Sequence, residues 1–497
     1  MLIPAEAFQL PQAAQGSLQQ RIRAMVTEGV LAGRFRPGQK LPSSRGLAAH
    51  LGVSRITVTL AYAELVSADY LAARGRSGYY ISDNAPVASH LPLTGARAEA
   101  VEFARLSGER FSGRGGVERP ADWESYGFPF IYGQADPTLF DHQNWRLCAV
   151  RALGRRDFAA MTADYYDRDD PLLIDHVLRQ ILPRRGIAAR EDEVLLTLGA
   201  QNALWITATC LLGGGRRAVM ENPGYPGLRA ILEAGGTQVL SVDVDEGGLP
   251  PWALPSGVDV VFTTASHQCP TNATMPLERR LALLQAAEKE RFIVVEDDYE
   301  FEMSFLKPVS PALKSLDVGG RVVYAGSFSK SVFPGMRLGY LVGPPGFIRE
   351  ARALRLMSLR HPPGHIQRTM AYFLSLGHYD AMVNRMRGAF KRRRQVMGEA
   401  IVANGLEVVG QGGFGGSSFW MRAAVDTDVL AAELRKDGVL IEPGGAFFDP
   451  ANPDNHHYRL GYGSITPAGI PQGIALIAEA IARQFHGPRT PGGPNGN

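Results

Sequence analysis

Hydrophobic and polar positions follow two different patterns along the chain, which divide it into a small helical part and a large mixed part. Near the amino terminus, Leu18, Ile22, Met25 and Val26 recur at the spacing of one face of a helix. From about residue 121 to 485, short apolar runs typical of buried strands alternate with helical patterns. This alternation predicts an α/β domain around a mostly parallel sheet.

The small part, residues 17–82, predicts three helices. The second is expected to begin at Pro42, because proline suits a first helical turn. Gly52 interrupts the pattern, and Ser54 can cap a third helix that continues to about Val66. Two helices joined by a short turn at a glycine form the helix-turn-helix pattern.

A predicted hairpin with a basic, glycine-rich tip follows the third helix. Tyr70-Leu-Ala-Ala and Tyr79-Tyr-Ile fit two short strands, with Arg74-Gly-Arg-Ser-Gly between them. Residues 17–82 contain nine Lys or Arg against three Asp or Glu, whereas the whole chain of 497 residues has a net charge of only +3. This local surplus indicates a polyanionic partner for the small part alone.

The small part resembles the GntR-type winged helix-turn-helix. The resemblance lies in Pro37-Gly-Gln-Lys-Leu-Pro-Ser-Ser-Arg, Leu51-Gly-Val-Ser-Arg and Ala61-Tyr. It implies binding to double-stranded promoter DNA, and the positions that it implies for DNA contact are Arg45, Ser54, Arg55, Thr57 and Gly78. The alternative interpretation is that the two helices simply pack together and that Arg45 is a solvated charge.

Three further segments differ from these parts in composition. Residues 1–16 form a lead without periodicity, residues 83–120 predict a linker, and residues 487–497 are too rich in Gly and Pro to hold structure. No apolar stretch approaches the length of about 18 residues that a membrane span needs. Three scattered cysteines without metal-ligand spacing, together with a start unlike a signal peptide, favour a cytoplasmic protein without a metal site.

In the large part, one lysine follows a predicted buried strand and is flanked by hydroxyl groups. The strand spans residues 322–325, and Ser327, Ser329, Lys330 and Arg337 come after it. A lysine amine can form a Schiff base with a phosphorylated aldehyde, while hydroxyls and a guanidinium bind the phosphate. This spacing also occurs in ordinary loops, so the cofactor interpretation requires suitable residues in other segments as well.

Three other segments supply the groups that such a cofactor needs. Gly199-Ala-Gln-Asn begins a helix, whose first backbone N–H groups can bind phosphate. A second buried strand ends in Asp297, Asp298 and Tyr299. A carboxylate there can pair with a pyridinium nitrogen, and a phenol can bond the 3-oxygen of the ring. Tyr225 lies on a turn and can stack on a flat ring.

Residues from about 128 to 485 resemble fold-type I aminotransferases, which use pyridoxal 5'-phosphate. The whole chain thus resembles the MocR/GabR family, in which a GntR-type domain precedes aminotransferase-like large and small domains. The resemblance implies Lys330 as the Schiff-base residue, Asp297 on the pyridine nitrogen and Tyr299 on the ring oxygen. It implies Tyr225 as the stacking residue. Around the phosphate it places Gly199, Ala200, Gln201, Ser327, Ser329 and Arg337.

The resemblance also implies a residue that binds the effector. At three other places the sequence departs from the pattern of the family. The resemblance implies that Arg459 binds the carboxylate of an effector through a bidentate salt bridge. Cys269 stands where active aminotransferases have an asparagine, which is expected to alter the pKa of the aldimine and weaken catalysis. Asn272 replaces a glycine, and asparagine tolerates a left-handed backbone. The segment with Tyr165 and Tyr166 lacks the family's glycine, so neither tyrosine is firmly assigned to bridge two subunits.

These observations favour a pyridoxal-phosphate-dependent transcription regulator. An amine or amino-acid effector would displace Lys330 by forming an aldimine with the cofactor, and the large domain would then reposition the DNA-binding module. The family resemblance implies a homodimer, so two modules would contact two half-sites. Two alternatives remain open: an active aminotransferase with an added DNA-binding domain, and a regulator that responds to pyridoxal phosphate itself.

Overall fold

The chain, described here by a computed structural model, divides into two compact units, Met1–Leu106 and Ser107–Asn497. The structure describes residues 2–10, 16–86, 111–112, 116–117, 119–410 and 412–486. The predicted tail lies outside the described residues, and so does most of the predicted linker.

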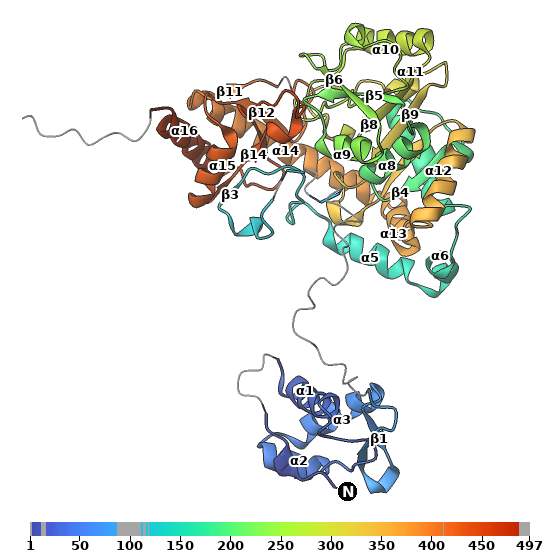
Figure 1. The fold of residues 1–497 in the computed structure, drawn as a ribbon, viewed down its shortest axis with the longest axis vertical. Helices are drawn as coiled ribbons and strands as arrows, with labels where there is room; N and C mark the ends of the chain where they lie inside the picture. The colour runs from blue at the N-terminus through green and yellow to red at the C-terminus, as the bar shows by residue number, and fades with distance from the viewer. Residues whose placement is uncertain are drawn as a thin grey trace, which may run out of the picture. The chain divides into compact units, whose positions relative to one another are not determined.

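The amino-terminal unit has the three helices and the hairpin that the sequence predicts (Figure 1). Its elements are α1 (Leu18–Leu31), α2 (Ser44–Leu51), α3 (Arg55–Ser67) and the antiparallel strands β1 (Leu71–Ala73) and β2 (Tyr79–Ile81). The hydroxyl of Ser54 accepts the N–H of Thr57 at 3.3 Å, which confirms the predicted cap of the third helix. The second helix begins after the predicted Pro42, because the Ser43 hydroxyl accepts the N–H of Gly46 and makes Ser43 the N-cap.

Residues ahead of α1 contribute to the core of this unit. Phe8 is fully buried, and its ring centroid lies 4.9 Å from that of Phe35. Ile3 is buried as well, and its N–H donates to the carbonyl of Lys40 at 2.8 Å. Part of the predicted lead therefore belongs to this core. The sequence did not indicate this, because the two apolar residues are isolated and show no helical or strand periodicity.

The carboxy-terminal unit is built around a seven-stranded sheet in the order β4-β10-β9-β8-β7-β5-β6. The strands are β4 (Val194–Thr197), β5 (Arg217–Asn222), β6 (Gln238–Asp243), β7 (Val260–Thr263), β8 (Ile293–Asp298), β9 (Val322–Ser327) and β10 (Gly339–Val342). Strand β10 pairs antiparallel with β4 and β9, and the other strand pairs of this sheet are parallel, so the predicted, mostly parallel sheet is confirmed.

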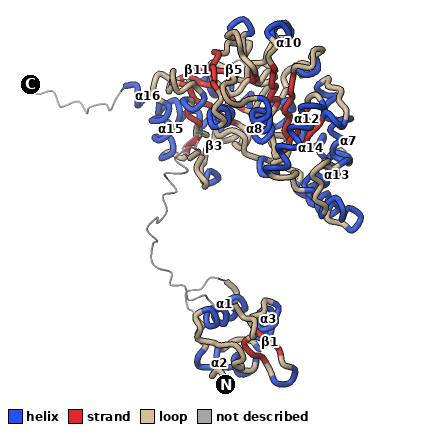
Figure 2. The backbone as a smooth tube through the Cα atoms, turned by 45° about the vertical axis from the view of Figure 1, so that its right-hand side comes forward, coloured by secondary structure: helices blue, strands red, loops and turns tan. Residues whose placement is uncertain are grey.

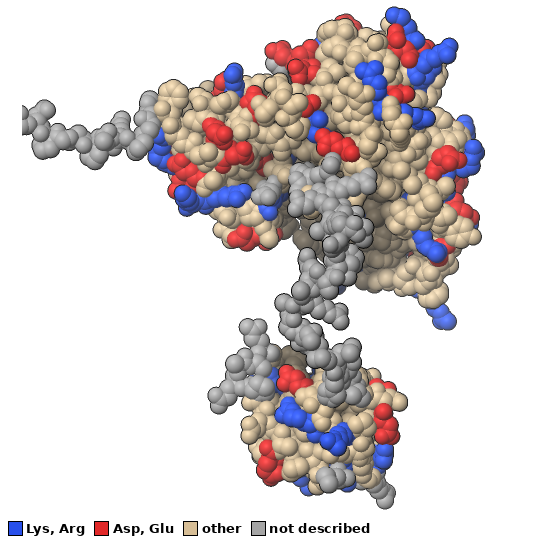
Figure 3. Space-filling view, viewed as in Figure 1, with Lys and Arg blue, Asp and Glu red and all other residues tan. Residues whose placement is uncertain are grey.

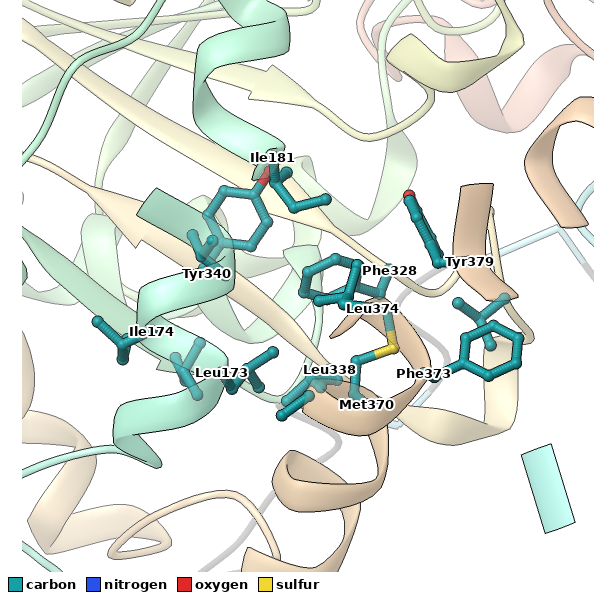
Figure 4. Packing of buried hydrophobic residues seen from close by; sticks show 14 of the residues in the cluster. Leu173, Ile174, Ile181, Phe328, Leu338, Tyr340, Met370, Phe373, Leu374 and Tyr379 are labelled. Carbon is teal, nitrogen blue, oxygen red and sulfur yellow. The ribbon is translucent and has the colours of Figure 1, made fainter. Parts of the chain in front are cut away.

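Helices cover both faces of this sheet (Figures 1 and 2). One face packs against α8 (Ala200–Leu211), α9 (Pro226–Ala234) and α12 (Pro345–Ser358). The opposite face packs against α7 (Pro171–His176), α10 (Leu277–Glu290), α11 (Leu313–Leu316) and α13 (Gly364–Ser375). Figure 4 shows part of this second face, where Phe328 and Tyr340 meet Leu173 and Met370. Central strands covered on both faces expose side chains only at their ends.

A smaller domain follows in the same unit. Its antiparallel sheet has the order β11-β12-β15-β14, with β11 (Glu407–Val408), β12 (Ser418–Arg422), β14 (Glu442–Pro443) and β15 (His457–Gly461). The helices that pack with it are α14 (His378–Ala403), α15 (Thr427–Lys436) and α16 (Ile470–His486). Strand β13 (Val439–Leu440) pairs with β3 (Phe128–Pro129), which ties residues shortly after the linker to this domain.

Three of the described α-helices lie between β3 and β4 in sequence, namely α5 (His142–Ala152), α6 (Phe158–Thr162) and α7. Helix α5 packs against α13 through its buried side. Among the described helices, none has the length and apolar character required to cross a membrane.

Candidate cofactor site and nucleic-acid interface

The carboxyl ends of the parallel strands surround a cavity of about 330 Å³. Most residues that the sequence assigns to a cofactor or effector line it, namely Ala200, Gln201, Tyr225, Asp297, Tyr299, Ser327, Ser329, Lys330, Arg337 and Arg459. Gly199 lies next to these residues at the start of α8. Parallel strands bring their carboxyl ends to one edge of a sheet, so segments far apart in sequence meet here.

One end of the cavity has the donor groups that a phosphate requires. Gly199 precedes α8 with φ 80°, and a Cβ there would lie 3.3 Å from the Ser329 hydroxyl and 3.4 Å from Arg337 Nη2. The Ser327 hydroxyl accepts the N–H of Ser329 at 3.1 Å. The Ser329 hydroxyl is buried and has no hydrogen-bond partner among the described residues. Helix N–H groups, two hydroxyls and a guanidinium therefore fit a phosphate group.

A buried carboxylate without a partner lies farther along the cavity. Neighbouring side chains of β8 point to opposite faces, so Asp298 pairs with Arg185 at 2.6 Å whereas Asp297 lines the cavity. Asp297 Oδ1 has no hydrogen-bond partner among the described residues. Burial, and secondarily the carboxylates of Asp298 and Glu221, raise the pKa of Asp297 to about 7. A protonated ring nitrogen is the partner that such a carboxylate lacks.

Lys330 faces the same cavity. Its Nζ lies 4.1 Å from the ring centroid of Tyr132, and a Cβ at Gly133 would come within 2.2 Å of it. Burial lowers the pKa of Lys330 to about 8, and the guanidiniums of Arg119 and Arg459 act in the same direction. A lowered pKa increases the neutral fraction of the amine, the form that attacks an aldehyde.

Aromatic and sulfur groups form other parts of the wall. The hydroxyl of Tyr225 donates to Gln201 Oε1 at 3.4 Å, and Tyr225 lines the cavity as Tyr299 does. Burial raises the pKa of Cys269 to about 12, so its thiol is neutral and offers only a weak hydrogen bond. Asn272 adopts φ 60°, which confirms that asparagine keeps the left-handed turn.

The arginine assigned to the effector already has a carboxylate partner within the chain. Arg459 on β15 lies opposite Glu442 on β14, and its Nε donates to Glu442 Oε2 at 2.7 Å. Arg119 Nε donates to the other oxygen of Glu442 at 3.0 Å. Sequence reasoning missed Tyr132, Arg119 and Glu442, because contacts across as many as 323 positions leave no local pattern.

Tyr165 and Tyr166 do not line this cavity. The Tyr165 ring lies under the guanidinium of Arg168, with 4.4 Å between the guanidinium carbon and the ring centroid, and Tyr166 is exposed.

The helix residues assigned to DNA lie on the surface of the amino-terminal unit. Arg45 is exposed on α2, and Arg55 is exposed at the first position of α3. Thr57 is half-buried, and Ser54 is the N-cap that fixes the start of this helix. Figure 3 shows Lys and Arg side chains as a band across the face of this unit that is turned to the viewer.

The hairpin adds cations near Gly78, which has φ 103°. The cationic groups of Lys40 and Arg74 lie 5.8 Å and 4.7 Å from the ring centroid of Tyr80. The Gly78 backbone is next to Lys40, since a Cβ at Gly78 would lie 3.4 Å from the Lys40 Cε. Lys40, which bridges to Tyr80 from the segment before α2, therefore lies beside the hairpin, and the sequence motif alone did not single out either residue.

Comparison with known proteins finds a family match in each of the two units. Residues 18–81 match the gntR family of bacterial regulatory proteins, and residues 160–470 match aminotransferase class I and II. The chain is 63% identical over 486 residues to the HTH-type transcriptional regulator TauR of Rhodobacter capsulatus, covering 97% of this chain and 100% of that protein. The chain belongs to the MocR/GabR family. Another relative is the probable rhizopine catabolism regulatory protein MocR of Rhizobium meliloti, 28% identical over 465 residues and 91% of each chain.

Solved structures show the fold of the carboxy-terminal unit of this MocR/GabR chain. LysN, an α-aminoadipate aminotransferase from Thermus thermophilus, is 25% identical with a TM-score of 0.69, covering 78% of this chain and 100% of that one. The kynurenine aminotransferase of Pyrococcus horikoshii is 25% identical with a TM-score of 0.67, covering 74% and 96%. The chain is thus a transcriptional regulator with a GntR-type domain and an aminotransferase-like domain, a fold whose family depends on pyridoxal phosphate.

The unpartnered carboxylate gives a pH-dependent prediction for the cofactor-free protein. The pKa of Asp297 in the folded chain, about 7, is above its ordinary value of 3.8. The folded state therefore loses stability as the pH rises between these values, and the loss is complete above pH 7. We expect Asp297→Asn to increase the free energy of unfolding by about 2–4 kcal/mol at pH 8, with the gain disappearing toward pH 4.

Urea unfolding followed by circular dichroism measures this difference. Asp298→Asn is the matched control, because it removes the carboxylate that pairs with the buried Arg185 and should destabilise the chain at pH 8. A gain for Asp297→Asn of the same size at both pH values would contradict the prediction.

Proposed function

We propose that this chain binds promoter DNA with its amino-terminal unit and senses an amine or amino-acid effector through pyridoxal 5'-phosphate in the cavity of its carboxy-terminal unit. The observation that carries the proposal is one cavity containing both the Lys330 amine and the unpartnered Asp297 carboxylate, in a chain with a GntR-type domain. When bound, pyridoxal phosphate supplies an aldehyde that a primary amine can attack.

The residues of the cavity have separate tasks in this proposal. Asp297 would accept a hydrogen bond from the ring nitrogen, Tyr299 would bond the ring oxygen and Tyr225 would stack on the ring. The residues that would hold the phosphate are Gly199, Ala200, Gln201, Ser327, Ser329 and Arg337. Lys330 would hold the cofactor through its amine, and Arg459 would attract the acidic group of an effector.

Effector and DNA are linked because each binds one arrangement of the protein more tightly than another. Arg45, Arg55, Thr57 and the backbone of Gly78 contact the DNA in this proposal, while Ser54 positions the recognition helix. The setting is the cytoplasm, where promoter DNA lies and where the free thiols of all three cysteines stay reduced.

The proposal includes a homodimer, and the surface of α5 supports it. Leu147, Val150 and Leu153 are each more than half exposed, although Cys148 and Ala152 on the other side of this helix are buried. Phe158, shortly after the helix, is 60% exposed. Neighbouring apolar side chains on one surface are typical of a protein interface, and a second copy of the chain is the partner we assign.

Active transamination is a second candidate, favoured by the lowered pKa of Lys330. An amine that titrates near neutral pH can both accept and return a proton. The neutral thiol of Cys269 in place of an asparagine argues against efficient turnover. Release of a carbonyl compound from the amine would identify this activity.

Sensing through the cofactor predicts that Lys330→Ala loses the response to the effector and keeps its basal binding to DNA. Without the Lys330 amine, the protein should lose the absorbance band of the lysine-bound cofactor, and acidic amines should no longer change its affinity for DNA, because there is no lysine for them to displace. Basal affinity for duplexes from upstream of the gene should stay within about two-fold of wild type, because Lys330 lies in the other unit. Fluorescence anisotropy and absorbance titration measure the two responses.

Lys391→Ala is the control, since Lys391 is exposed on α14 and does not line the cavity. It should respond as wild type does. A normal response in Lys330→Ala would refute sensing through this lysine. A change in DNA affinity on adding pyridoxal phosphate without any amine would support a regulator that responds to the cofactor itself.

The DNA interface predicts unequal effects of two arginines in the amino-terminal unit. Arg55→Ala should weaken binding to upstream duplexes at least about 10-fold and reduce the slope of log affinity against log salt by about one. Arg23→Ala should have little effect, because Arg23 on α1 pairs with Glu64 at 3.1 Å. Equal losses in the two variants would show that general charge, and not the recognition helix, determines binding.

The dimer predicts that charge on α5 separates the subunits. Leu147→Glu combined with Val150→Glu should convert a wild-type dimer to monomers, because two carboxylates would have to be buried without partners. Sedimentation velocity measures the mass, and Lys289→Glu, a charge change at an exposed position of α10, is the control. A wild-type monomer at micromolar concentration would overturn the homodimer.

A further inference from the structure

Helix α3 has apolar side chains on its exposed side as well as on its buried side. Ile56 is 72% exposed, and Leu60, one turn later, is 49% exposed. The buried side of the helix contacts the core of the amino-terminal unit through Val58, Tyr62 and Leu65. Neither exposed side chain belongs to this core, so the packing of the unit does not account for them.

The polar groups of α3 are arranged around Ile56 in a way that leaves an apolar surface at the start of the helix. Arg55 is the only basic residue of α3, and it is exposed. The Thr59 hydroxyl donates to the backbone carbonyl of Arg55 at 2.9 Å, so its hydrogen is used within the helix. Glu64, at the other end of α3, accepts from Arg23 on α1 at 3.1 Å. The start of α3 therefore presents a guanidinium next to an aliphatic side chain.

The charges near α3 indicate which partner covers this surface. Helix α2 and strand β1 both contact α3. Arg45 is exposed on α2, and Arg74, which directly follows β1, has a side chain that is 51% exposed. Cations on α3 itself and on both of these neighbours complement a polyanion, and a purely apolar protein surface would not match them. Double-stranded DNA is the polyanion that also has apolar groups within reach of a helix.

We infer that Ile56 contacts the C5-methyl group of a thymine in the major groove and so determines a preference for thymine at one position of each half-site. The thymine methyl is the apolar group that base edges present in this groove. The first residues of a recognition helix are those that reach base edges, and Ile56 is the second residue of α3. The inference rests on the proposed function, because it concerns the DNA that the amino-terminal unit binds.

A methyl contact differs from the contacts of arginines with phosphates in two measurable ways. Phosphates are alike at every base pair, and binding to them weakens as the salt concentration rises. Contact between Ile56 and a methyl group removes apolar surface from water at a single base pair. Loss of that methyl group should therefore weaken binding at one position only, by a factor that is the same at low and at high salt.

The test removes single methyl groups from the DNA. Deoxyuridine pairs with adenine as thymidine does and lacks the C5-methyl group, so each thymine of a bound upstream duplex is replaced in turn. Fluorescence anisotropy with the full-length protein measures the affinity at two salt concentrations. Wild type should lose affinity about 3- to 10-fold at one thymine of each half-site, to the same extent at both salt concentrations.

Variants of the exposed residues show whether Ile56 is the partner of that methyl group. Ile56→Ala should bind the thymine and deoxyuridine duplexes within about two-fold of each other, because the side chain that contacts the methyl group is gone. Ile56→Val should keep part of the preference, since most of the aliphatic surface remains. Leu18→Ala is the matched control, because it shortens a side chain that is 44% exposed at the first position of α1, and it should keep the wild-type preference.

The outcomes separate this inference from the proposed function. If wild type binds the duplexes but no deoxyuridine weakens binding, or if Ile56→Ala keeps the loss, the role of Ile56 is overturned while DNA binding stands. A loss that disappears at high salt would overturn it as well. If Ile56→Ala lowers the mass in sedimentation velocity and leaves the thymine preference unchanged, the surface is a contact between copies of this chain and the inference is wrong. If no upstream duplex binds at low salt, the proposed function fails and the inference fails with it.

Discussion

Because helices cover both faces of the seven-stranded sheet, a polar side chain on a parallel strand needs a partner inside the protein or a place at the end of the strand. Strand β8 shows both solutions. Glu296 accepts the backbone N–H groups of Leu313 and Lys314, and Asp298 pairs with Arg185. Asp297, pointing to the other face, has no such partner among the described residues and faces the cavity. The candidate cofactor site thus lies where a buried carboxylate has no partner from the described part of the chain.

The sequence could predict those features that depend on short stretches of chain. The cap at Ser54, the lysine after β9 and the acidic end of β8 each follow from a junction between neighbouring elements. These junctions carry their own residue types, because caps, turns and helix starts have local hydrogen-bonding needs. A resemblance built on such motifs therefore indicated the fold as well as the position of the cavity.

The features that escaped prediction depend on contacts between distant segments. Glu442 has no motif around it, and its role appears only when β14 pairs with β15 and the segment with Arg119 returns to the cavity. Ile3 and Phe8 fill the core of the amino-terminal unit without any period in the sequence. The periodicity of a sequence indicates which face of a helix or strand a residue occupies. It does not indicate which side chain from a distant segment that residue contacts.

Burial of Lys330 and Asp297 also has a consequence for how long the protein survives in a cell. Burial disfavours the charged form of both groups, as the lowered pKa of the amine and the raised pKa of the carboxyl show. A bound molecule that uses the amine covalently and pairs with the carboxylate therefore stabilises the folded chain by mass action. Since proteases degrade mainly opened chains, a ligand of this kind would slow the degradation of the chain.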